Sequence, residues 1–197
     1  PAAHILLIMV DSTASPDVLV VGAGPTGLTA ALAAVQAGLT VRIIDQGLER
    51  TQYSKALVTH ARTMEIFAAL GIADDVATAG RELKALNLRG SFGVRGRVTL
   101  DESDWGDTAY PHWLIIPQFA VENLLEQALA RHQVQVEWGT QLTGLQQSAS
   151  SATAEVAIQD QPQTITSSWV IGADGGHSTV RAIIGSKFQR TESEASL

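Results

Sequence analysis

The chain has 197 residues, of which 45% are hydrophobic, and it carries a formal net charge of −7. That length is enough for one well-buried domain, and the acidic balance argues against a nucleic-acid partner. Cysteine is absent, which excludes disulfides, thiolate metal sites and thiol catalysis and fits a reducing compartment, so we expect a cytoplasmic protein.

The N-terminal segment is set apart from the rest of the chain. Its apolar run Ile5–Val10 is too short to cross a bilayer and no Lys or Arg precedes it, so it is typical of neither a membrane helix nor a signal peptide. We therefore expect no membrane partner. Pro1 cannot initiate translation whereas Met9 can, and we expect residues 1–16 to be a leader outside the fold.

The first predicted elements are a strand, a helix and a second strand. Val18–Val21 is an uninterrupted apolar run, typical of a buried parallel strand, and Val41–Ile44 is another that ends in Asp45. Between them Pro25 opens a predicted helix that Gly38 ends. Its apolar residues recur with helical spacing at Leu28, Ala31, Leu32 and Val35. This pattern predicts one βαβ unit of an α/β fold with a Rossmann-like parallel sheet.

The middle of the chain predicts one helix and irregular strands. Thr59–Leu70 has helical periodicity and Gly71 stops it. We expect its inward face to consist of Met64, Phe67 and Ala68. Arg81–Leu100 is rich in Gly and Arg and alternates weakly, which indicates irregular strands, and Asp101–Tyr110 is acidic and typical of a turn.

The last part of the chain returns to the predicted sheet. Pro117 opens a third helix with an apolar stripe at Val121, Leu124, Leu125, Ala128 and Leu129. Strands are predicted at Val134–Trp138 and Thr164–Ile171, with a hairpin of Leu142–Gln146 and Ala154–Gln159 between them. We expect Val134–Trp138 and Trp169–Ile171 to join the parallel sheet, and Ser178–Ile184 to form a short helix capped by Ser178.

A glycine-rich turn separates the first strand from the first helix. Gly22–Gly27 reads GAGPTG and has the spacing of a dinucleotide-binding turn. Gly22 allows the tight turn, Gly24 lets a pyrophosphate approach the backbone, and Gly27 lets the helix pack on the sheet. The helix N-terminus then offers N–H groups to the phosphates. Asp45 follows where a carboxylate can bind ribose hydroxyls and disfavour a 2′-phosphate, but the spacing does not distinguish FAD from NAD.

A second turn of the same kind lies near the C-terminus. Gly172–Gly175 reads GADG, follows a predicted strand and precedes Ser178 and Arg181. Asp174 in such a turn is also a common helix-capping residue, and we expect Arg181 to brace the turn rather than to contact a ligand. If both turns hold one ligand, those at Gly24 and Asp174 must converge on one cleft.

The motifs together resemble the class A flavoprotein monooxygenases, the family of para-hydroxybenzoate hydroxylase and the polyketide aromatic hydroxylases. Four matches occur in the family's order between about residues 17 and 188: Gly22–Gly27 with Asp45, Ser54-Lys55-Ala56 followed by His60–Glu65, Pro117-Gln118 at a helix start, and Gly172–Gly175 with Ser178 and Arg181. The resemblance implies FAD as the cofactor and NAD(P)H as its reductant. With O₂, such an enzyme would hydroxylate a small phenolic or polyketide-like aromatic substrate.

The resemblance also implies a set of cofactor-binding residues, although it assigns no catalytic residue. They are Gly22, Gly24, Pro25, Thr26, Gly27, Asp45, Gln46, Arg62, Gln118 and Asp174. Besides Asp174, two of these residues have an alternative interpretation. Gln118 could bond a neighbouring backbone group, and Arg62 could be a solvated helix charge.

The domain organisation implied by the resemblance is discontinuous. Residues 17–79 and 116–188 would form an FAD-binding domain, residues 80–115 part of a β-rich substrate region, and residues 189–197 a truncated tail. Lys55 stands where Arg is commoner in the family, and Gln46 where a basic residue is usual. The family's third motif, a Gly-Asp pair, would lie beyond residue 197, so we expect an N-terminal portion that is inactive alone.

Two other functions stay open at this point. An NAD-dependent Rossmann dehydrogenase explains Gly22–Asp45 but not Gly172–Arg181, and a truncated nucleotide-binding domain would have no catalytic role. The five histidines form no HExxH motif and no Gly-x-Ser-x-Gly elbow exists, so we expect neither a metal site nor a serine nucleophile.

Overall fold

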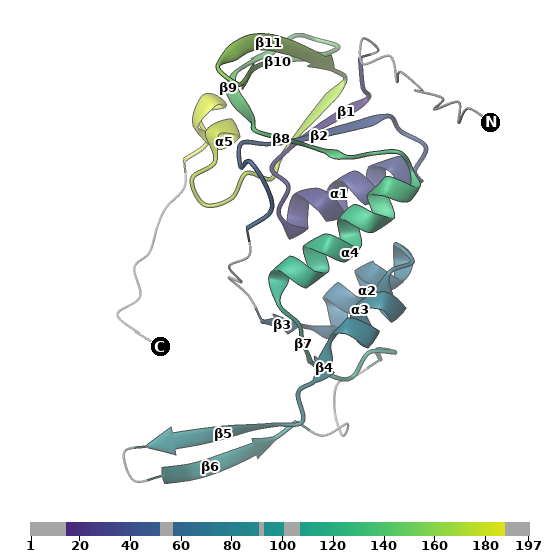
Figure 1. Cartoon of the computed structure of the whole chain (residues 1–197), viewed down its shortest axis with the longest axis vertical. Coiled ribbons are helices and arrows are strands. Elements are labelled where there is room, and N and C mark those ends of the chain that lie inside the picture. The colour runs from purple at the N-terminus through teal and green to yellow at the C-terminus, as the bar shows by residue number, and fades with distance from the viewer. Residues whose placement is uncertain (1–14, 52–56, 91–92, 101–106, 188–197) are drawn as a thin grey trace, which may run out of the picture.

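The structure is a computed structural model that describes residues 15–51, 57–90, 93–100 and 107–187 (Figure 1). The Ser54-Lys55-Ala56 match, the predicted tail and nearly all of the predicted leader lie outside the described residues, as does most of the predicted turn at Asp101–Tyr110.

A four-stranded parallel sheet lies at the centre of the fold. Its strand order is β12-β1-β2-β8, with β1 at Val18–Val21, β2 at Val41–Asp45, β8 at Val136–Trp138 and β12 at Trp169–Gly172. Strands from both ends of the chain therefore meet in one sheet, as predicted. The α/β fold with a parallel sheet is confirmed.

The two faces of this sheet have different coverings, and the side chains of β1 and β2 alternate between them. Val18, Val20 and Ile43 belong to the core on the helical face. Leu19, Val21 and Ile44 belong to the core on the opposite face. Because both faces are covered, β1 is apolar at every position, which explains the uninterrupted run in the sequence.

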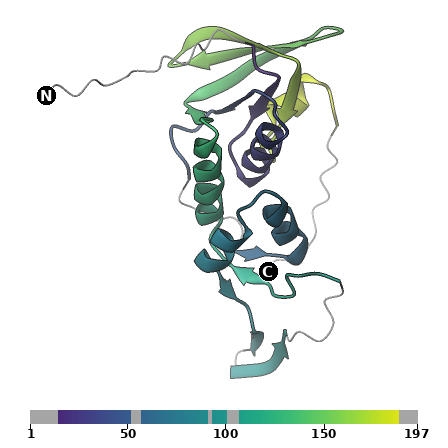
Figure 2. The same cartoon turned by 90° about the vertical axis from the view of Figure 1, so that its right-hand side faces the viewer.

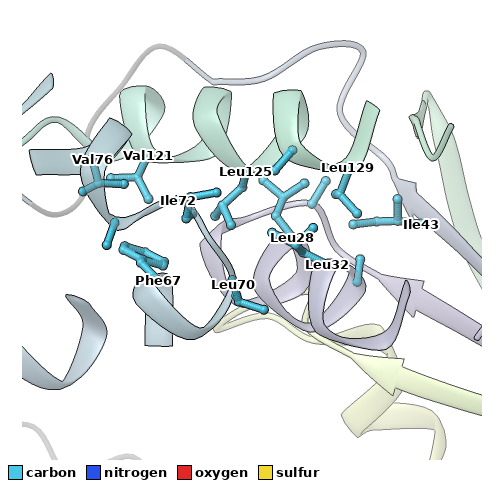
Figure 3. Packing of buried hydrophobic residues seen from close by; sticks show 14 of the residues in the cluster. Leu28, Leu32, Ile43, Phe67, Leu70, Ile72, Val76, Val121, Leu125 and Leu129 are labelled. Atoms are coloured by element: carbon cyan, nitrogen blue, oxygen red, sulfur yellow. The ribbon is translucent and has the colours of Figure 1, made fainter. Parts of the chain in front are cut away.

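Two long helices cover one face and pack against each other (Figures 2 and 3). They are α1 at Pro25–Gln36 and α4 at Gln118–Arg131. Leu28 and Leu32 of α1 and Leu125 of α4 are fully buried in the same core. Gly38, which follows the C-cap residue of α1, adopts a φ of +85°, as expected of a glycine that ends a helix.

An antiparallel sheet covers the other face. It consists of β9 at Thr140–Gln147, β10 at Ala152–Ile158 and β11 at Gln161–Ser167. The predicted single strand Thr164–Ile171 is wrong, because β11 and β12 belong to different sheets. The chain turns a corner at Ser168, across which the buried Ser167 hydroxyl donates a 3.0 Å hydrogen bond to the Trp169 carbonyl oxygen.

Apart from a short helix after β12, the remaining elements lie on the far side of α4 from the sheet (Figure 1). They are α2 at Ala61–Ala69, α3 at Ala73–Ala79, a small sheet of β3 (Val58–Thr59), β7 (Leu114–Ile115) and β4 (Arg81–Glu82), and a hairpin of β5 (Ala85–Gly90) and β6 (Gly93–Thr99). The hairpin extends away from the body of the molecule.

Two predictions in this part are corrected. The helix predicted from Thr59 begins only at Ala61, because Val58 and Thr59 pair with β7, and Ala68 is exposed rather than inward. Helix α3 was not predicted from the sequence. Its signal was Asp74 and Asp75, which lie in the first turn, where the helix dipole favours negative charge.

None of the helices in the described residues is long and apolar enough to span a membrane.

The α1–α4 contact gives a stability prediction. Replacing Leu125 with alanine should lower the free energy of unfolding by about 2–5 kcal/mol, because Leu125 is fully buried between the two helices. Urea unfolding measures the change. Leu39→Ala is the control, since Leu39 is 40% exposed and its truncation should cost roughly 0.5 kcal/mol or less. Equal losses in the two variants would contradict this assignment of the core.

Candidate cofactor-binding site

The two glycine-containing turns lie side by side at the carboxyl end of the parallel sheet. β1 and β12 are neighbours with Val21 opposite Gly172, and the Ala173 N–H donates to the Val21 carbonyl at 2.7 Å. Gly24 and Asp174 line one cleft, so the convergence predicted from the sequence is confirmed. Ligands of open α/β sheets bind in this position, outside the carboxyl ends of the strands.

Each glycine of the first turn meets a different steric requirement. A Cβ on Gly22 would lie 2.4 Å from the Ala173 carbonyl oxygen, and a Cβ on Gly27 would lie 1.9 Å from the Gly22 oxygen. These two glycines therefore let the turns and α1 pack closely. A Cβ on Gly24 would have nothing within 4 Å and would enter the cleft, so Gly24 keeps the backbone open to a ligand.

The cleft has a volume of about 490 Å³ and is lined by six segments of the fold, one of which is the start of β9 with Thr140 and Leu142. The first turn and the start of α1 form one wall, the loop after β2 and the end of β8 a second, and the turn after β12 a third. Helix α4 contributes two polar side chains. Among its lining residues are Gly22, Gly24, Pro25, Thr26, Asp45, Gln46, Arg50, Gln118, Glu122, Trp138 and Asp174.

Asp45 ties the walls of the cleft together. Its carboxylate accepts a 2.7 Å hydrogen bond from the Ala23 N–H of the first turn and a 2.8 Å bond from the Gly47 N–H. This bracing role was not predicted from the sequence. Because each carboxylate oxygen can accept more than one hydrogen bond, Asp45 keeps acceptor capacity toward the cleft that it lines.

Asp174 also has a structural role. Its carboxylate accepts hydrogen bonds from the Ser178 hydroxyl at 2.5 Å and from the Thr179 N–H at 2.6 Å, at the start of α5 (Thr179–Ile183). Ser178 in turn accepts a bond from the Arg181 N–H at 3.0 Å, which confirms it as a cap. The Arg181 guanidinium donates to the Gly176 carbonyl at 2.6 Å and braces the turn, as predicted.

Helix α4 presents a buried carboxyl group to the cleft. Glu122 is only 2% exposed, and its Oε1 accepts a 2.8 Å hydrogen bond from Gln118 Nε2. Burial raises the pKa of Glu122 above its usual value, while the Gln118 hydrogen bond and the charge of Arg50 oppose that change. A raised carboxyl pKa makes Glu122 costly to ionise in the folded chain.

The sequence-predicted residues divide into three groups by position. Gly22, Gly24, Pro25, Thr26, Asp45, Gln46, Gln118 and Asp174 line the cleft. Gly27 is buried beneath it, at the contact between α1 and the first turn. Arg62 lies on α2 outside the cleft, with a side chain that is 74% exposed and paired with Glu65 at 2.8 Å and Asp107 at 3.4 Å. A flavin-side role for Arg62 therefore stays a prediction.

Several cleft residues were missed by sequence reasoning. Arg50 lies in the loop after β2, and Trp138 is the last residue of β8. Gly176 and His177 belong to the turn after β12. The signal that could have found them is the rule that parallel strands deliver their carboxyl ends to one edge, applied also to the end of β8 and to the whole loops after β2 and β12.

The cleft is suited to a dinucleotide. It combines an open glycine backbone, the N-terminus of a twelve-residue helix and a carboxylate at the end of the second strand. The fold and this edge of the sheet define a Rossmann-like dinucleotide-binding domain.

The sequence profile of the FAD binding domain family matches residues 15–197, so the chain belongs to that family, whose cofactor is FAD. It is 34% identical over 173 residues to 6-methylpretetramide 4-monooxygenase of Streptomyces rimosus, covering 86% of this chain and 30% of the relative. It is 35% identical over 184 residues to pentachlorophenol 4-monooxygenase of Sphingobium chlorophenolicum, covering 92% and 34%. The chain thus spans about a third of these relatives' length.

A solved structure has the same fold. The crystal structure of a flavin-dependent monooxygenase in complex with FAD and substrate superposes with a TM-score of 0.81 at 26% identity, covering 88% of this chain and 32% of the other. The resemblance to flavoprotein monooxygenases inferred from four motifs is therefore confirmed.

The glycine geometry predicts that two similar substitutions have opposite effects. Gly27→Ala should lower the free energy of unfolding by about 1–3 kcal/mol, because the new methyl group would overlap a backbone oxygen. Gly24→Ala should leave stability within about 0.5 kcal/mol, since its methyl group meets no protein atom. It should instead weaken FAD binding roughly ten-fold or more, because the methyl group enters the cleft. Chemical denaturation and FAD titration separate the two effects, and unchanged FAD affinity in Gly24→Ala would contradict the assignment.

Glu122 gives a prediction for the pH dependence of stability. Because its folded pKa is raised, the native state holds the proton more tightly than the unfolded chain, and ionised Glu122 costs stability at higher pH. Glu122→Gln keeps an acceptor for Gln118 and should be more stable than the unsubstituted chain at pH 8. The gain should shrink as pH falls through the folded pKa and vanish near pH 4. Urea unfolding across this range tests it, and a gain that grows toward acid would contradict it.

Proposed function

We propose that this chain forms the cofactor-binding part of an FAD-dependent monooxygenase that hydroxylates an aromatic substrate with NAD(P)H and O₂. The observation that carries the proposal is the shared cleft of the Gly24 and Asp174 turns in a chain of the FAD binding domain family. The names of the two relatives, which act on a pretetramide and on pentachlorophenol, support a phenolic or polyketide-like substrate. When bound, the flavin supplies the redox chemistry and the activation of O₂.

The residues of this chain would bind and orient the cofactor. Gly22 and Gly24, with Pro25 and the N–H groups of the first turn of α1 from Thr26 onward, would bind the pyrophosphate, because the helix N-terminus carries partial positive charge and its N–H groups donate to phosphate oxygens. Gly27 would hold α1 against the turn. Asp45 and Gln46 would contact the adenosine ribose. None of these roles moves a proton, so the chemistry assigned to this chain is positioning.

The other end of the cofactor would meet the later segments. Gln118 would contact the region between the ribityl chain and the pyrophosphate, and Asp174 would hold its turn against the flavin side of the cleft. Arg62 would face the flavin only if its exposed side chain exchanges Glu65 and Asp107 for the cofactor.

The proposed domain organisation follows the same division. Residues 17–79 and 116–188 would form the FAD-binding domain, and the common core of α1, α4 and the parallel sheet supports that assignment. Residues 80–115 would contribute to a substrate region, which the position of β4 to β7 beyond α4 supports (Figure 1). We also propose a cytoplasmic location, since the chain contains no cysteine.

Ligand-dependent stabilisation tests the cofactor. FAD at one hundred times its dissociation constant should stabilise the folded chain by about 2.7 kcal/mol, because only the native state binds it. The melting temperature with FAD, NAD or neither measures the effect. A shift with NAD and none with FAD would favour the dehydrogenase. No shift with either would favour a domain without a catalytic role.

Isotope incorporation tests the reaction. The natural polypeptide that carries this chain, supplied with FAD, NADPH or NADH and a phenol, should place one oxygen atom of ¹⁸O₂ in the hydroxylated product. Mass spectrometry of the product distinguishes this from water as the oxygen source. Label taken from H₂¹⁸O instead would show hydrolytic or hydration chemistry and would refute the monooxygenase proposal.

A further inference from the structure

A partly buried ion pair joins Arg50, which lines the cleft, to helix α4. Arg50, in the loop after β2, donates from Nε to Glu126 Oε1 at 2.9 Å, and its Nη2 lies 2.8 Å from Glu126 Oε2. The Arg50 Nη1 donates to Asn123 Oδ1 at 3.3 Å. The side chains of Arg50 and Glu126 are 26% and 22% exposed. This bidentate contact joins the β2 loop to helix α4, and we call it the Arg50 latch.

The latch acts on the face of α4 that reaches the cofactor cleft. Gln118, Glu122 and Glu126 are spaced four residues apart and therefore follow one another along one face of the helix. The first two line the cleft, and the third holds Arg50. The distance between this helix face and the β2 loop is consequently fixed by the latch.

The β2 loop is held at three points along its length. Asp45 accepts from the Gly47 N–H at its start, and the Gly47 carbonyl accepts from the Gly139 N–H at 2.7 Å. The latch holds its later part at Arg50. Residues 46, 47, 49, 50 and 51 all line the cleft, so the loop forms its wall beside Asp45.

The electrostatics of the cleft make the position of this loop important. Among the described lining residues, Arg50 is the only Lys or Arg, whereas Asp45, Glu49, Glu122 and Asp174 bring four carboxyl groups. A pyrophosphate entering this cleft adds more negative charge. An Arg50 held by Glu126 stays at the wall in a defined orientation and keeps Glu49 and the loop backbone in place.

We propose that Arg50 is a positioning residue, which through its latch to Glu126 and Asn123 holds the β2 loop against the adenosine-diphosphate half of FAD. The inference rests on the proposed cofactor role of the cleft. It assigns Arg50 to the adenosine half because the loop continues directly from Asp45. In the proposed arrangement the flavin half lies with Gln118 and the turn after β12.

Four variants of the full 197-residue chain test the latch. Arg50→Met removes it, Arg50→Lys keeps the charge without the two-pronged geometry, and Glu126→Gln keeps the volume of the partner without its charge. Arg42→Met is the matched control, because Arg42 forms a comparable bidentate pair with Glu137 at 2.7 Å but does not line the cleft. Melting curves confirm that each variant folds, and calorimetric titrations give the affinities for FAD, ADP and FMN.

The latch predicts a selective loss of affinity. Arg50→Met should weaken FAD and ADP by a similar factor, roughly ten-fold, and leave FMN unchanged, with Arg50→Lys intermediate. Arg42→Met should bind all three ligands as the unsubstituted chain does. Glu126→Gln distinguishes the two explanations best, because it leaves the Arg50 guanidinium without its carboxylate partner. Weaker FAD binding is expected if the latch positions the loop, and tighter binding if Arg50 is simply a cation for the pyrophosphate.

The outcomes distinguish failure of the positioning role of Arg50 from failure of the proposed cofactor role of the cleft. If the unsubstituted chain binds FAD and Arg50→Met binds it equally well, the latch has no positioning role, while the cofactor cleft stands. Unchanged or tighter FAD binding by Glu126→Gln also overturns the positioning role. If the unsubstituted chain binds neither FAD nor ADP, the proposed cofactor role of the cleft fails and the inference fails with it.

Discussion

The close approach of two backbone turns is the constraint on which the site depends. The Ala173 carbonyl oxygen lies where a side chain at Gly22 would begin, and the Gly22 carbonyl occupies the corresponding place at Gly27. These contacts place β1, α1 and the turn after β12 in one tightly packed corner. Any side chain at Gly22 or Gly27 would push these elements apart. Such a substitution would disrupt the wall of the cleft even if the substituted residue made no contact with a ligand.

The same corner explains why segments from both ends of the chain form one sheet. β12 arrives beside β1 only after the chain has passed through α4 and the antiparallel sheet. Both faces of β1 are then buried, by the helices on one side and by β9 to β11 on the other. A parallel strand without either cover would expose apolar side chains, so the late elements complete the core that the early motif needs.

The sequence was informative where a residue pattern has one structural solution. The apolar run Val18–Val21, the glycine turn and Gly38 predicted β1 and α1 with their boundaries, because buried parallel strands and left-handed helix ends admit few alternatives. The run that ends at Ile171 was less informative. Its β pattern continues through Ser167 and Trp169, and only the tertiary structure separates β11 from β12.

Side-chain partners were harder to predict than elements. Asp45 and Asp174 were identified as ligand residues, and the structure shows that both carboxylates also hold backbone N–H groups. Arg50 meets Glu126 across 76 positions of sequence, a pairing that depends on how far α4 lies from the β2 loop. Such contacts depend on how close two segments lie in the folded chain, and no local sequence pattern indicates them.

The cleft holds its charges by internal pairing. Asp45 and Asp174 are satisfied by backbone N–H groups, Glu122 by Gln118, and Arg50 by Glu126 and Asn123. A site arranged in this way is preorganised, because its polar groups keep their orientation without a ligand. The binding energy of an anionic dinucleotide then need not order the walls, and the N–H groups at the start of α1 can meet the phosphates directly. Three of the acidic residues that line the cleft, Asp45, Glu122 and Asp174, accept hydrogen bonds from the protein's own donors, and these bonds lower the cost of placing carboxyl groups beside an anion.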